Sequence, residues 1–481
     1  MTDDLSPARS MLQRRHLLPA LAMIALVTLG ALENRATSTV LPVVAEDLGG
    51  LTWFGAATIG PGLTYVIAVV LAGAWIDRRG PGPAIFTGVG LFLIGQLVIA
   101  SAQTMLVVVA GRLMSGIAEG LFDIGITVLI VTTIPERLRP RMISLIAMAW
   151  ILPSVLGPQL AGGIAEQAGW RWVFLLGGVL AVPVALALIG PIRRSRRAPQ
   201  DAADHGGVGL GTLPYAIAVA GTMGAAAALA PLAAGGGSLL IIGAAGLILL
   251  VGIGIWCARP LLPTGTLALR RGVGATVGLG AALSAAFAVG SSYLPLMLIE
   301  VSGFSPAMAG LSMTITGLFW AAGSWLQGSP AVQRRTRVTR RVGLGFAFVA
   351  FGLIAMAGTA AGLIMPVIGL AGWAVAGVGI GLASASLSVH RYTLVADSEQ
   401  GRVAAGNSLL GSAAISAGGV GVGYAIAASA PHPPAALFVI VFAAAALLAT
   451  TGALLSRRIL PPPELSEVSS PMTQLSSDKS A

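Results

Sequence analysis

Charged residues and cysteine are scarce in this sequence, and each shortage excludes a class of protein. Asp, Glu, Lys and Arg make up 10% of the 481 residues, against about 25% in an average soluble domain. The single cysteine, Cys257, cannot form an internal disulfide, so the chain is not a scaffold held by disulfides. The low charge excludes an ordinary soluble domain.

Apolar residues and glycine are abundant instead. The chain is 56% hydrophobic, has a mean hydropathy of +0.89 and contains 65 glycines. Small residues let helices pack closely in lipid, and this composition suits that setting. The net charge of +10 comes from arginines at the ends of apolar runs, which orient a membrane protein rather than bind nucleic acid. We therefore expect an all-α integral membrane protein, with the lipid bilayer and no nucleic acid as its partner.

Apolar runs long enough to span a bilayer, which takes about 20 residues, occur fourteen times. The first six lie at 17–42, 52–76, 83–102, 105–133, 141–164 and 170–191. Two more lie at 212–232 and 238–258, and the last six at 272–299, 306–328, 340–360, 362–388, 402–428 and 434–456. The predicted fold is two six-helix bundles with two extra central transmembrane helices.

These runs divide the chain into five predicted parts. A cytoplasmic tail (1–16) precedes the N-terminal six-helix bundle (17–191). A basic connector with the two extra helices (192–261) leads to the C-terminal six-helix bundle (262–458). The tail at 459–481 is rich in Pro and Ser and lacks apolar periodicity, which is typical of a disordered segment.

Basic residues are distributed unevenly between the two ends of these runs. Apart from Arg35 and Arg112 inside helices, only Arg171 among the 28 Lys and Arg residues lies on the side opposite the N-terminus. Because short positive loops stay in the cytoplasm, we expect both termini inside the cell and the chain in the inner (plasma) membrane. Two parallel six-helix halves predict a transporter that rocks around a site near the midplane.

Three ionisable residues interrupt the apolar run at 111–133. Arg112, Glu119 and Asp123 are spaced so that a helix places them within a stripe roughly 40° wide. A charge at the bilayer centre costs about 2.5–3.5 kcal/mol even on insertion scales. Several charges on one face must therefore pair with each other or line a wet cavity.

An acidic residue of the first run is the predicted partner of this stripe. Glu33 lies nine residues from Pro42, and Arg112 lies seven residues from Met105, the expected outer ends of their helices. These spacings correspond to depths of roughly 13.5 and 10.5 Å. The two side chains can therefore meet, either to serve transport or only to hold the helices together.

The two carboxylates of the stripe predict proton chemistry. Glu119 and Asp123 lie one helical turn apart, where like charges repel, so one of them should bind a proton more readily than a free carboxylate does. A site that holds either a proton or a cation, but not both, couples their movements. The stripe therefore predicts an antiporter with protons as the coupling ion.

Other polar residues in the apolar runs admit two interpretations. Asn34, Ser38 and Gln159 either line a cavity or form interhelical hydrogen bonds. Tyr293 is either a packing residue or a platform for a cationic substrate. Arg35 lies nearest the outer surface and is explained by snorkelling.

Five short segments combine charged or aromatic residues with Gly and Pro at fixed spacings. The segments at 73–80 (GAWIDRRG), 112–116 (RLMSG) and 157–163 (GPQLAGG) fit the patterns G-x-x-x-D-R-x-G, R-x-x-Q-G (with Ser for Gln) and G-P-x-x-G-G. The segments at 32–42 (LENRATSTVLP) and 170–174 (WRWVF) are similar to L-D-x-T-x-x-N-x-x-L-P and W-R-W-x-F. Through these motifs the chain resembles the major facilitator superfamily, specifically its fourteen-helix drug:proton antiporter branch, of which G-P-x-x-G-G is the antiporter element. The chain departs at Arg35, Ser38 and Ser115, where the branch has a neutral residue, Asn and Gln.

The resemblance implies a function and assigns roles to residues. It implies the major facilitator fold and conformational gating by residues of the two Gly-containing motifs: Asp77, Arg78, Gly80, Gly157, Pro158 and Gly162. It implies a monomeric secondary transporter that exports hydrophobic or cationic drugs in exchange for protons and thereby confers antibiotic resistance. It implies no cofactor, metal or enzymatic activity. Glu119 and Asp123 lie outside the matching positions and rest on the charge argument alone.

Two alternative functions remain open at this point. The same fold could export an endogenous lipid, siderophore or antibiotic. A membrane-embedded transferase is a more distant alternative, and it would need acidic or His-rich loop motifs, which the sequence does not display. External loops such as that at 101–104 are very short, which leaves no room outside for a folded catalytic domain.

Overall fold

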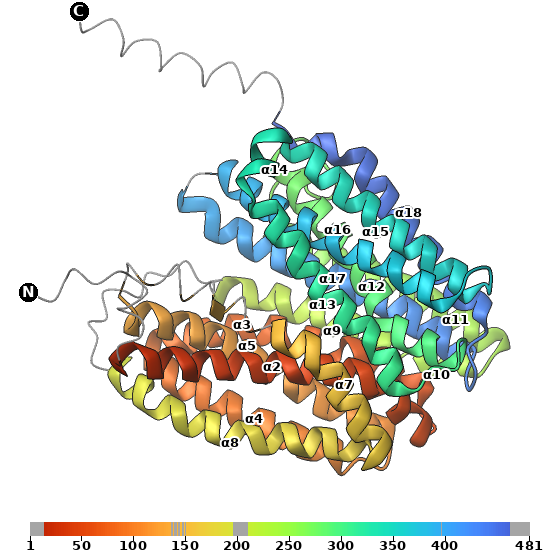
Figure 1. Cartoon of the computed structure of the whole chain (residues 1–481), viewed down its shortest axis with the longest axis horizontal. Helices are drawn as coiled ribbons and strands as arrows, with labels where there is room; N and C mark the ends of the chain where they lie inside the picture. Colours follow the sequence, from red (N-terminus) through yellow and green to blue (C-terminus); the bar gives the residue numbers. More distant parts are fainter. Residues whose placement is uncertain are drawn as a thin grey trace, which may run out of the picture.

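The computed structural model describes residues 14–135, 138, 142, 145–146, 149, 151–195, 210–395 and 397–461. Within these ranges every regular element is a helix and none is a strand. The predicted tails and much of the predicted basic connector lie outside the described residues. The helices form two groups that lie side by side (Figure 1).

The first group contains six long helices near the predicted runs. They are α2 (Arg14–Asp47), α3 (Phe54–Arg79), α4 (Pro81–Ala100), α5 (Met105–Thr133), α7 (Ile151–Gln167) and α8 (Trp170–Ser195). The expected end of the first run at Pro42 is wrong, because α2 continues through this proline to Asp47. Helices in lipid tolerate an internal proline where neighbouring groups satisfy the freed backbone.

The second group also contains six long helices. They are α12 (Val273–Glu300), α13 (Pro306–Gly328), α15 (Val338–Ala360), α16 (Pro366–Thr393), α17 (Asp397–Ala428) and α18 (Ala435–Leu455), with the short α14 (Pro330–Arg335) after α13. The start of α13 is capped, since the Ser305 hydroxyl accepts a hydrogen bond from the Met308 N–H and Pro306 occupies the first turn. Each six-helix group therefore corresponds to one predicted bundle.

The segment between the groups folds as α9 (Leu213–Ala227), α10 (Ala230–Ala234) and α11 (Gly237–Ala258). Met223 of α9 packs in one apolar cluster with Ile59 of α3 and Val420 of α17. A second cluster joins Val219 of α9 to Leu409 of α17, with Val66 of α3 against it. The α9–α11 segment therefore contacts both groups along the seam between α3 and α17.

Twelve helices in the described part are long and apolar enough to cross a membrane, so the predicted count of fourteen is not reached. The two bundle helices that fall short are α7 and α13. The described part of α7 has 17 residues, and α13 contains several glycine, Ser and Thr residues that lower its hydropathy. In α13, Gly310 and Gly317 face Pro158 and Ser154 of α7, so close packing has replaced apolar surface in that helix.

The two groups touch along α7–α13 and α3–α17 at the end remote from the termini. A Cβ atom on Gly162 would lie 2.6 Å from Ala307 Cα, and one on Gly55 would lie 2.5 Å from Gly423 Cα. Only glycine permits backbones this close. Toward the N-terminus the two groups diverge (Figure 1).

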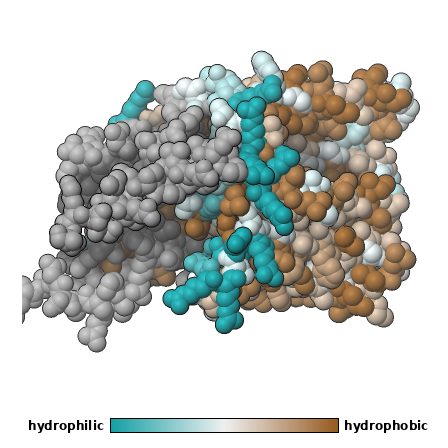
Figure 2. Space-filling view, turned by 90° about the horizontal axis from the view of Figure 1, so that it is seen from above, coloured by the Kyte–Doolittle hydropathy of each residue, from teal (hydrophilic) through white to brown (hydrophobic). Residues whose placement is uncertain are grey.

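Arginines gather at one end of the described helices, next to a mainly apolar surface. Figure 2 shows a hydrophilic band across the molecule beside a broad apolar surface. Exposed arginines end several helices of both groups: Arg78, Arg79, Arg193, Arg335 and Arg457. Arginines of this kind mark a membrane boundary.

The close contact at Gly162 predicts that the stability of the protein is sensitive to a side chain at this position. Gly162→Ala should lower the unfolding free energy in detergent by about 1–3 kcal/mol, because its new Cβ meets the backbone of Ala307, which cannot move aside. Gly163→Ala is the matched control, since a Cβ there meets nothing within 4 Å, and it should leave stability unchanged or raise it by up to about 1 kcal/mol. Equal stability of the two variants would contradict this packing.

Candidate functional site

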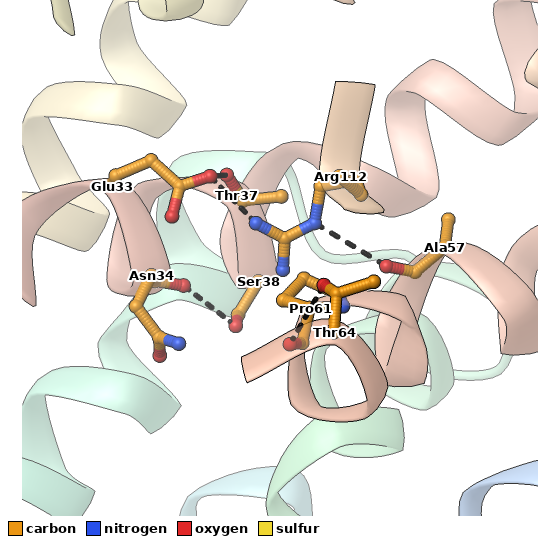
Figure 3. Close-up of polar contacts among 8 residues, drawn as sticks. All are labelled: Glu33, Asn34, Thr37, Ser38, Ala57, Pro61, Thr64 and Arg112. Carbon is orange, nitrogen blue, oxygen red and sulfur yellow. Dashed lines mark hydrogen bonds and ion pairs between the residues drawn. The ribbon is translucent and has the colours of Figure 1, made fainter. Parts of the chain in front are cut away.

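A buried ion pair joins the first helix to the fourth. Arg112 Nη1 of α5 lies 2.6 Å from Glu33 Oε1 of α2, and the two side chains are 5% and 3% exposed (Figure 3). This is the contact that the sequence predicts. The spacing behind this prediction was wrong in one respect, because α2 ends at Asp47 rather than Pro42, so Glu33 lies farther than nine residues from that end of the helix.

Further hydrogen bonds fix the pair against α3. Arg112 Nε donates to the Ala57 carbonyl at 3.3 Å, and the Thr37 hydroxyl donates to Glu33 Oε1 at 3.2 Å (Figure 3). Thr64 of α3 donates to the carbonyl of Leu113, next to the arginine, at 2.7 Å. The sequence analysis missed Thr37, although its position one turn after Glu33 was a usable signal. Three helices are therefore tied together through one arginine.

A second acidic side chain, Glu119, is near enough to this ion pair to feel its charges. Glu119 interacts electrostatically with both Glu33 and Arg112, and its Oε1 is buried without a hydrogen-bond partner. Glu33 Oε2 is also buried without a partner. One guanidinium neutralises one carboxylate, so the site holds an excess negative charge unless a proton or another cation is bound. Buried charge of this kind is costly when it is not compensated.

Asp123 belongs to a different environment from Glu119. It is exposed, and its Oδ2 accepts a 2.6 Å hydrogen bond from the Tyr65 hydroxyl of α3. On the helix it shares the face of Arg112. The predicted stripe of Arg112, Glu119 and Asp123 is therefore exposed at its Asp123 end. Tyr65 was missed, because a lone tyrosine in an apolar run gives no indication of its partner.

Two of the predicted substrate-contact residues, Ser38 and Gln159, form side-chain hydrogen bonds within the protein. The Ser38 hydroxyl donates to the Asn34 carbonyl at 2.8 Å, within α2. Gln159 Nε2 donates to the Thr314 hydroxyl of α13 at 2.8 Å, which links the two groups. The Gln159 bond joins two helices, as the second of the two interpretations expects, whereas the Ser38 bond lies within α2 and matches neither interpretation.

Tyr293 is fully buried, and its hydroxyl donates to the Gly419 carbonyl at 2.7 Å. Its ring packs against Phe54 of α3, with the centroids 5.7 Å apart. It also lines a cavity of about 120 Å³ between α3, α12 and α17, together with the hydroxyl groups of Thr58, Ser292, Ser412 and Ser416. A small hydroxyl-rich cavity therefore lies between the two groups.

The GPQLAGG segment lies where α7 meets α2 and α13. A Cβ on Gly157 would lie 3.2 Å from Leu32 of α2, and one on Gly310 of α13 would lie 3.0 Å from Pro158. One turn beyond Gly162, Glu166 Oε1 accepts a 2.9 Å hydrogen bond from the Ala307 N–H at the start of α13. Carboxylates are favourable at a helix N-terminus. These residues therefore hold the two groups together at the end remote from the termini.

The GAWIDRRG segment ends α3 at the basic end. Gly80 adopts φ 75° and ψ 173°, a backbone region that is essentially restricted to glycine, and Pro81 then starts α4. Arg78 is exposed in the last turn of α3. The side chain of Asp77 lies outside the described residues. The backbone conformation of Gly80 therefore explains why this motif ends in glycine.

The WRWVF segment has a partner that the sequence analysis missed. Arg171 Nη1 lies 3.3 Å from Asp47 Oδ2, and Trp170 Nε1 donates to the same oxygen at 2.9 Å. The guanidinium also lies over the Trp170 ring, 4.2 Å from its centroid. These contacts tie the start of α8 to the last residue of α2.

The shared arginine predicts unequal effects of removing either partner. Arg112→Gln should cost about 3–5 kcal/mol of unfolding free energy in detergent, because Glu33 and Glu119 both lose their cation. Glu33→Gln should cost less, since Glu119 remains beside Arg112. The double variant should lose less than the sum of the two, with a coupling of about 1 kcal/mol or more. Equal single losses that add in the double variant would contradict the shared pair.

Comparisons with known proteins agree with this architecture. The chain is 28% identical over 414 residues to a probable multidrug-efflux transporter of Mycobacterium tuberculosis, which covers 81% of this chain and 83% of that protein. Shorter matches at 29% and 30% identity cover 26% of an uncharacterized transporter of Schizosaccharomyces pombe and 40% of the methylenomycin A resistance protein of Bacillus subtilis. They span 31% and 38% of this chain.

A solved structure shares the fold. The crystal structure of the peptide transporter POT in complex with sulfate superposes with a TM-score of 0.66, covering 92% of this chain and 94% of that chain at 17% identity. The family model of the Major Facilitator Superfamily matches residues 23–419. The protein is thus a multi-pass membrane transporter rather than an enzyme, and the chain belongs to the Major Facilitator Superfamily.

Proposed function

We propose that the protein exports hydrophobic, cationic compounds in exchange for protons, as a member of the fourteen-helix drug:proton antiporter branch. In this proposal α7 and α13 also cross the membrane, and α9 and α11 are the two extra central helices. Both termini lie in the cytoplasm, and the protein works in the plasma membrane as a monomer. The relatives named as a multidrug-efflux transporter and a resistance protein support export of toxic compounds.

The observation that carries the proposal is the imbalance of buried charge around Arg112. Glu33 and Glu119 together present two carboxylates to one guanidinium, and each has a buried oxygen without a partner. Either a proton or a cationic substrate can supply the missing positive charge. Because the two compete for the same charge, binding of one releases the other, which is the requirement for exchange.

The surroundings of Asp123 supply a route for the proton. This carboxylate is exposed, is bonded to Tyr65 and lies one turn from Glu119 toward the basic end. The two halves diverge at that end (Figure 1). In this conformation the route leads to the cytoplasm, where a substrate would enter.

Export requires the outer contacts to part. The backbone contact between Gly162 and Ala307 and the hydrogen bond from Ala307 to Glu166 close the outer end. In the proposed cycle they separate after substrate has displaced the proton, while the basic ends approach each other. The membrane potential supplies about 2.3 kcal/mol per elementary charge at 100 mV, to which the pH gradient adds.

Gradient-driven transport of rhodamine 123 in inverted membrane vesicles tests this function. With an imposed pH gradient, Glu119→Gln should reduce the initial rate about tenfold, in the range expected for coupling between two ligands, because the exchangeable charge is lost. Glu33→Gln should reduce it as well, and Asp123→Asn should slow it by removing the route to water.

Glu46→Gln is the matched control, because this carboxylate is exposed at the outer end of α2, and it should transport like the wild type. Retention of gradient-driven transport by the variants at Glu33, Glu119 and Asp123 would overturn the proposed mechanism. Transport by the wild type without any dependence on the gradient would indicate a facilitator instead.

A further inference from the structure

The cavity between α3, α12 and α17 is lined by hydroxyl groups and, among the described residues, by no charged side chain. Its polar side chains are Thr58, Ser292, Tyr293, Ser412 and Ser416, and its other lining residues are glycine or apolar. Its volume of about 120 Å³ corresponds to about four waters at about 30 Å³ each. Pockets for whole drug-sized molecules measure about 300–1,000 Å³. This hydroxyl cavity therefore suits one group of a larger molecule.

Three of the five hydroxyls have no hydrogen-bond partner in the described part of the chain, namely those of Ser292, Ser412 and Ser416. Ser416 is only 3% exposed, and a polar group buried to this degree normally has a partner. Ser292 and Ser412 are half-buried. None of the three hydroxyls is fully enclosed, in contrast to that of Ser115. The hydroxyl cavity therefore offers three accessible groups to a bound molecule.

The two other hydroxyls have already donated their hydrogens. The Thr58 hydroxyl donates to the Phe54 carbonyl at 2.8 Å, and the Tyr293 hydroxyl donates to the Gly419 carbonyl at 2.7 Å. Their oxygens can still accept, whereas a free serine hydroxyl can donate and accept. An ionised group would lose its hydration here without a charged partner. The lining therefore matches a neutral group that both donates and accepts, as an alcohol does.

The hydroxyl cavity lies next to the contact that joins α3 to α17. Thr58 follows Gly55 by three residues and Ser416 precedes Gly423 by seven, and the backbones of these two glycines meet. Thr58 lies four residues after the start of α3, a separation of about 6 Å. Side chains of both six-helix groups line the cavity. A molecule bound there would therefore contact both halves of the transporter.

The hydroxyl cavity is separate from the charges around Arg112. The Ala57 carbonyl of α3 accepts a hydrogen bond from Arg112. Thr58, Gly62 and Ile59 line the cavity, and they are rotated from Ala57 by about 100°, 140° and 200° around the same helix. Binding in the cavity therefore does not require a molecule to touch the ion pair.

We propose that the hydroxyl cavity binds a neutral alcohol or polyol group of a transported compound, with Ser292, Ser412 and Ser416 as the residues that select it. The substrates then extend beyond cationic compounds to neutral molecules that carry hydroxyl groups. This inference rests on the transport of small molecules by the chain. It does not depend on proton exchange at Glu119.

Equilibrium binding of two neutral dyes to the full chain in lipid nanodiscs tests the proposal. One is the nitrobenzoxadiazole conjugate of serinol, which carries two alcohols. The other is the conjugate of 3-aminopentane, in which methyl groups replace both hydroxyls. After subtraction of the signal from empty nanodiscs, the wild type should bind the diol about tenfold more tightly. Ser412→Ala should weaken the diol about fivefold, as expected for one neutral hydrogen bond, and change the alkyl dye less than twofold.

Two threonine variants provide a matched comparison. Thr58 and Thr451 both donate to a carbonyl of their own helix, but Thr451 is exposed on α18, away from the cavity. Thr58→Val should weaken the diol about threefold, because it removes one acceptor, whereas Thr451→Val should leave both dyes unchanged. Thermal unfolding of Ser412→Ala should match that of the wild type, since this hydroxyl has no partner to lose.

Transport in inverted vesicles tests whether the bound group belongs to a substrate. Ser412→Ala should lower the initial rate for the diol at subsaturating concentration about fivefold, and the rate for rhodamine 123, which carries no alcohol, less than twofold. Equal weakening of the two neutral dyes, or a wild type without preference for the diol, would overturn the binding site. Binding of the diol without its transport would overturn its assignment to a transported compound.

Failure of the proposed proton exchange has a different signature. It would appear as transport of rhodamine 123 that ignores the pH gradient, whatever the affinity of the diol. The two proposals can therefore fail independently.

Discussion

The buried ion pair between Glu33 and Arg112 is the interaction on which the first half of the protein depends. It places a guanidinium where α2, α3 and α5 meet. Arg112 also donates to the Ala57 carbonyl, and Glu33 accepts a hydrogen bond from Thr37, so both side chains have little freedom. A buried pair of this kind adds little net stability, because desolvation offsets the attraction. The pair matters for the chemistry of the site, because Arg112 is already paired with Glu33 and leaves the charge of Glu119 without a cation of its own. The charge that remains makes the site responsive to a proton or a cation.

The contacts between the halves complement this site. They are made by small residues at the end remote from the termini, where Gly162 meets Ala307 and Gly55 meets Gly423. Such contacts are specific in shape but contain few polar bonds, apart from those of Glu166 and Gln159 across α7–α13. An interface of this type can separate without leaving buried charges behind. The α3–α17 seam is also covered by the α9–α11 segment, whereas α7 and α13 meet directly.

Much of the fold could be predicted from the sequence, because apolar runs reveal helices whatever their neighbours are. The pairing of Glu33 with Arg112 could also be predicted, since charges in lipid must find a partner. Local pattern could not show which residue meets Asp123, because Tyr65 comes from another helix. Nor could it show that α2 passes Pro42 and continues to Asp47. The helix count failed where packing against a protein neighbour has replaced apolar residues in α13.

The central claim is that one proton and the positive group of a substrate compete for the charge beside Arg112. The most direct measurement is the release of protons when rhodamine 123 is added to the detergent-solubilised protein in an almost unbuffered solution. We predict that the wild type releases protons in proportion to the dye bound, and that Glu119→Gln binds dye without releasing them. Dye binding by the wild type without proton release would contradict the account.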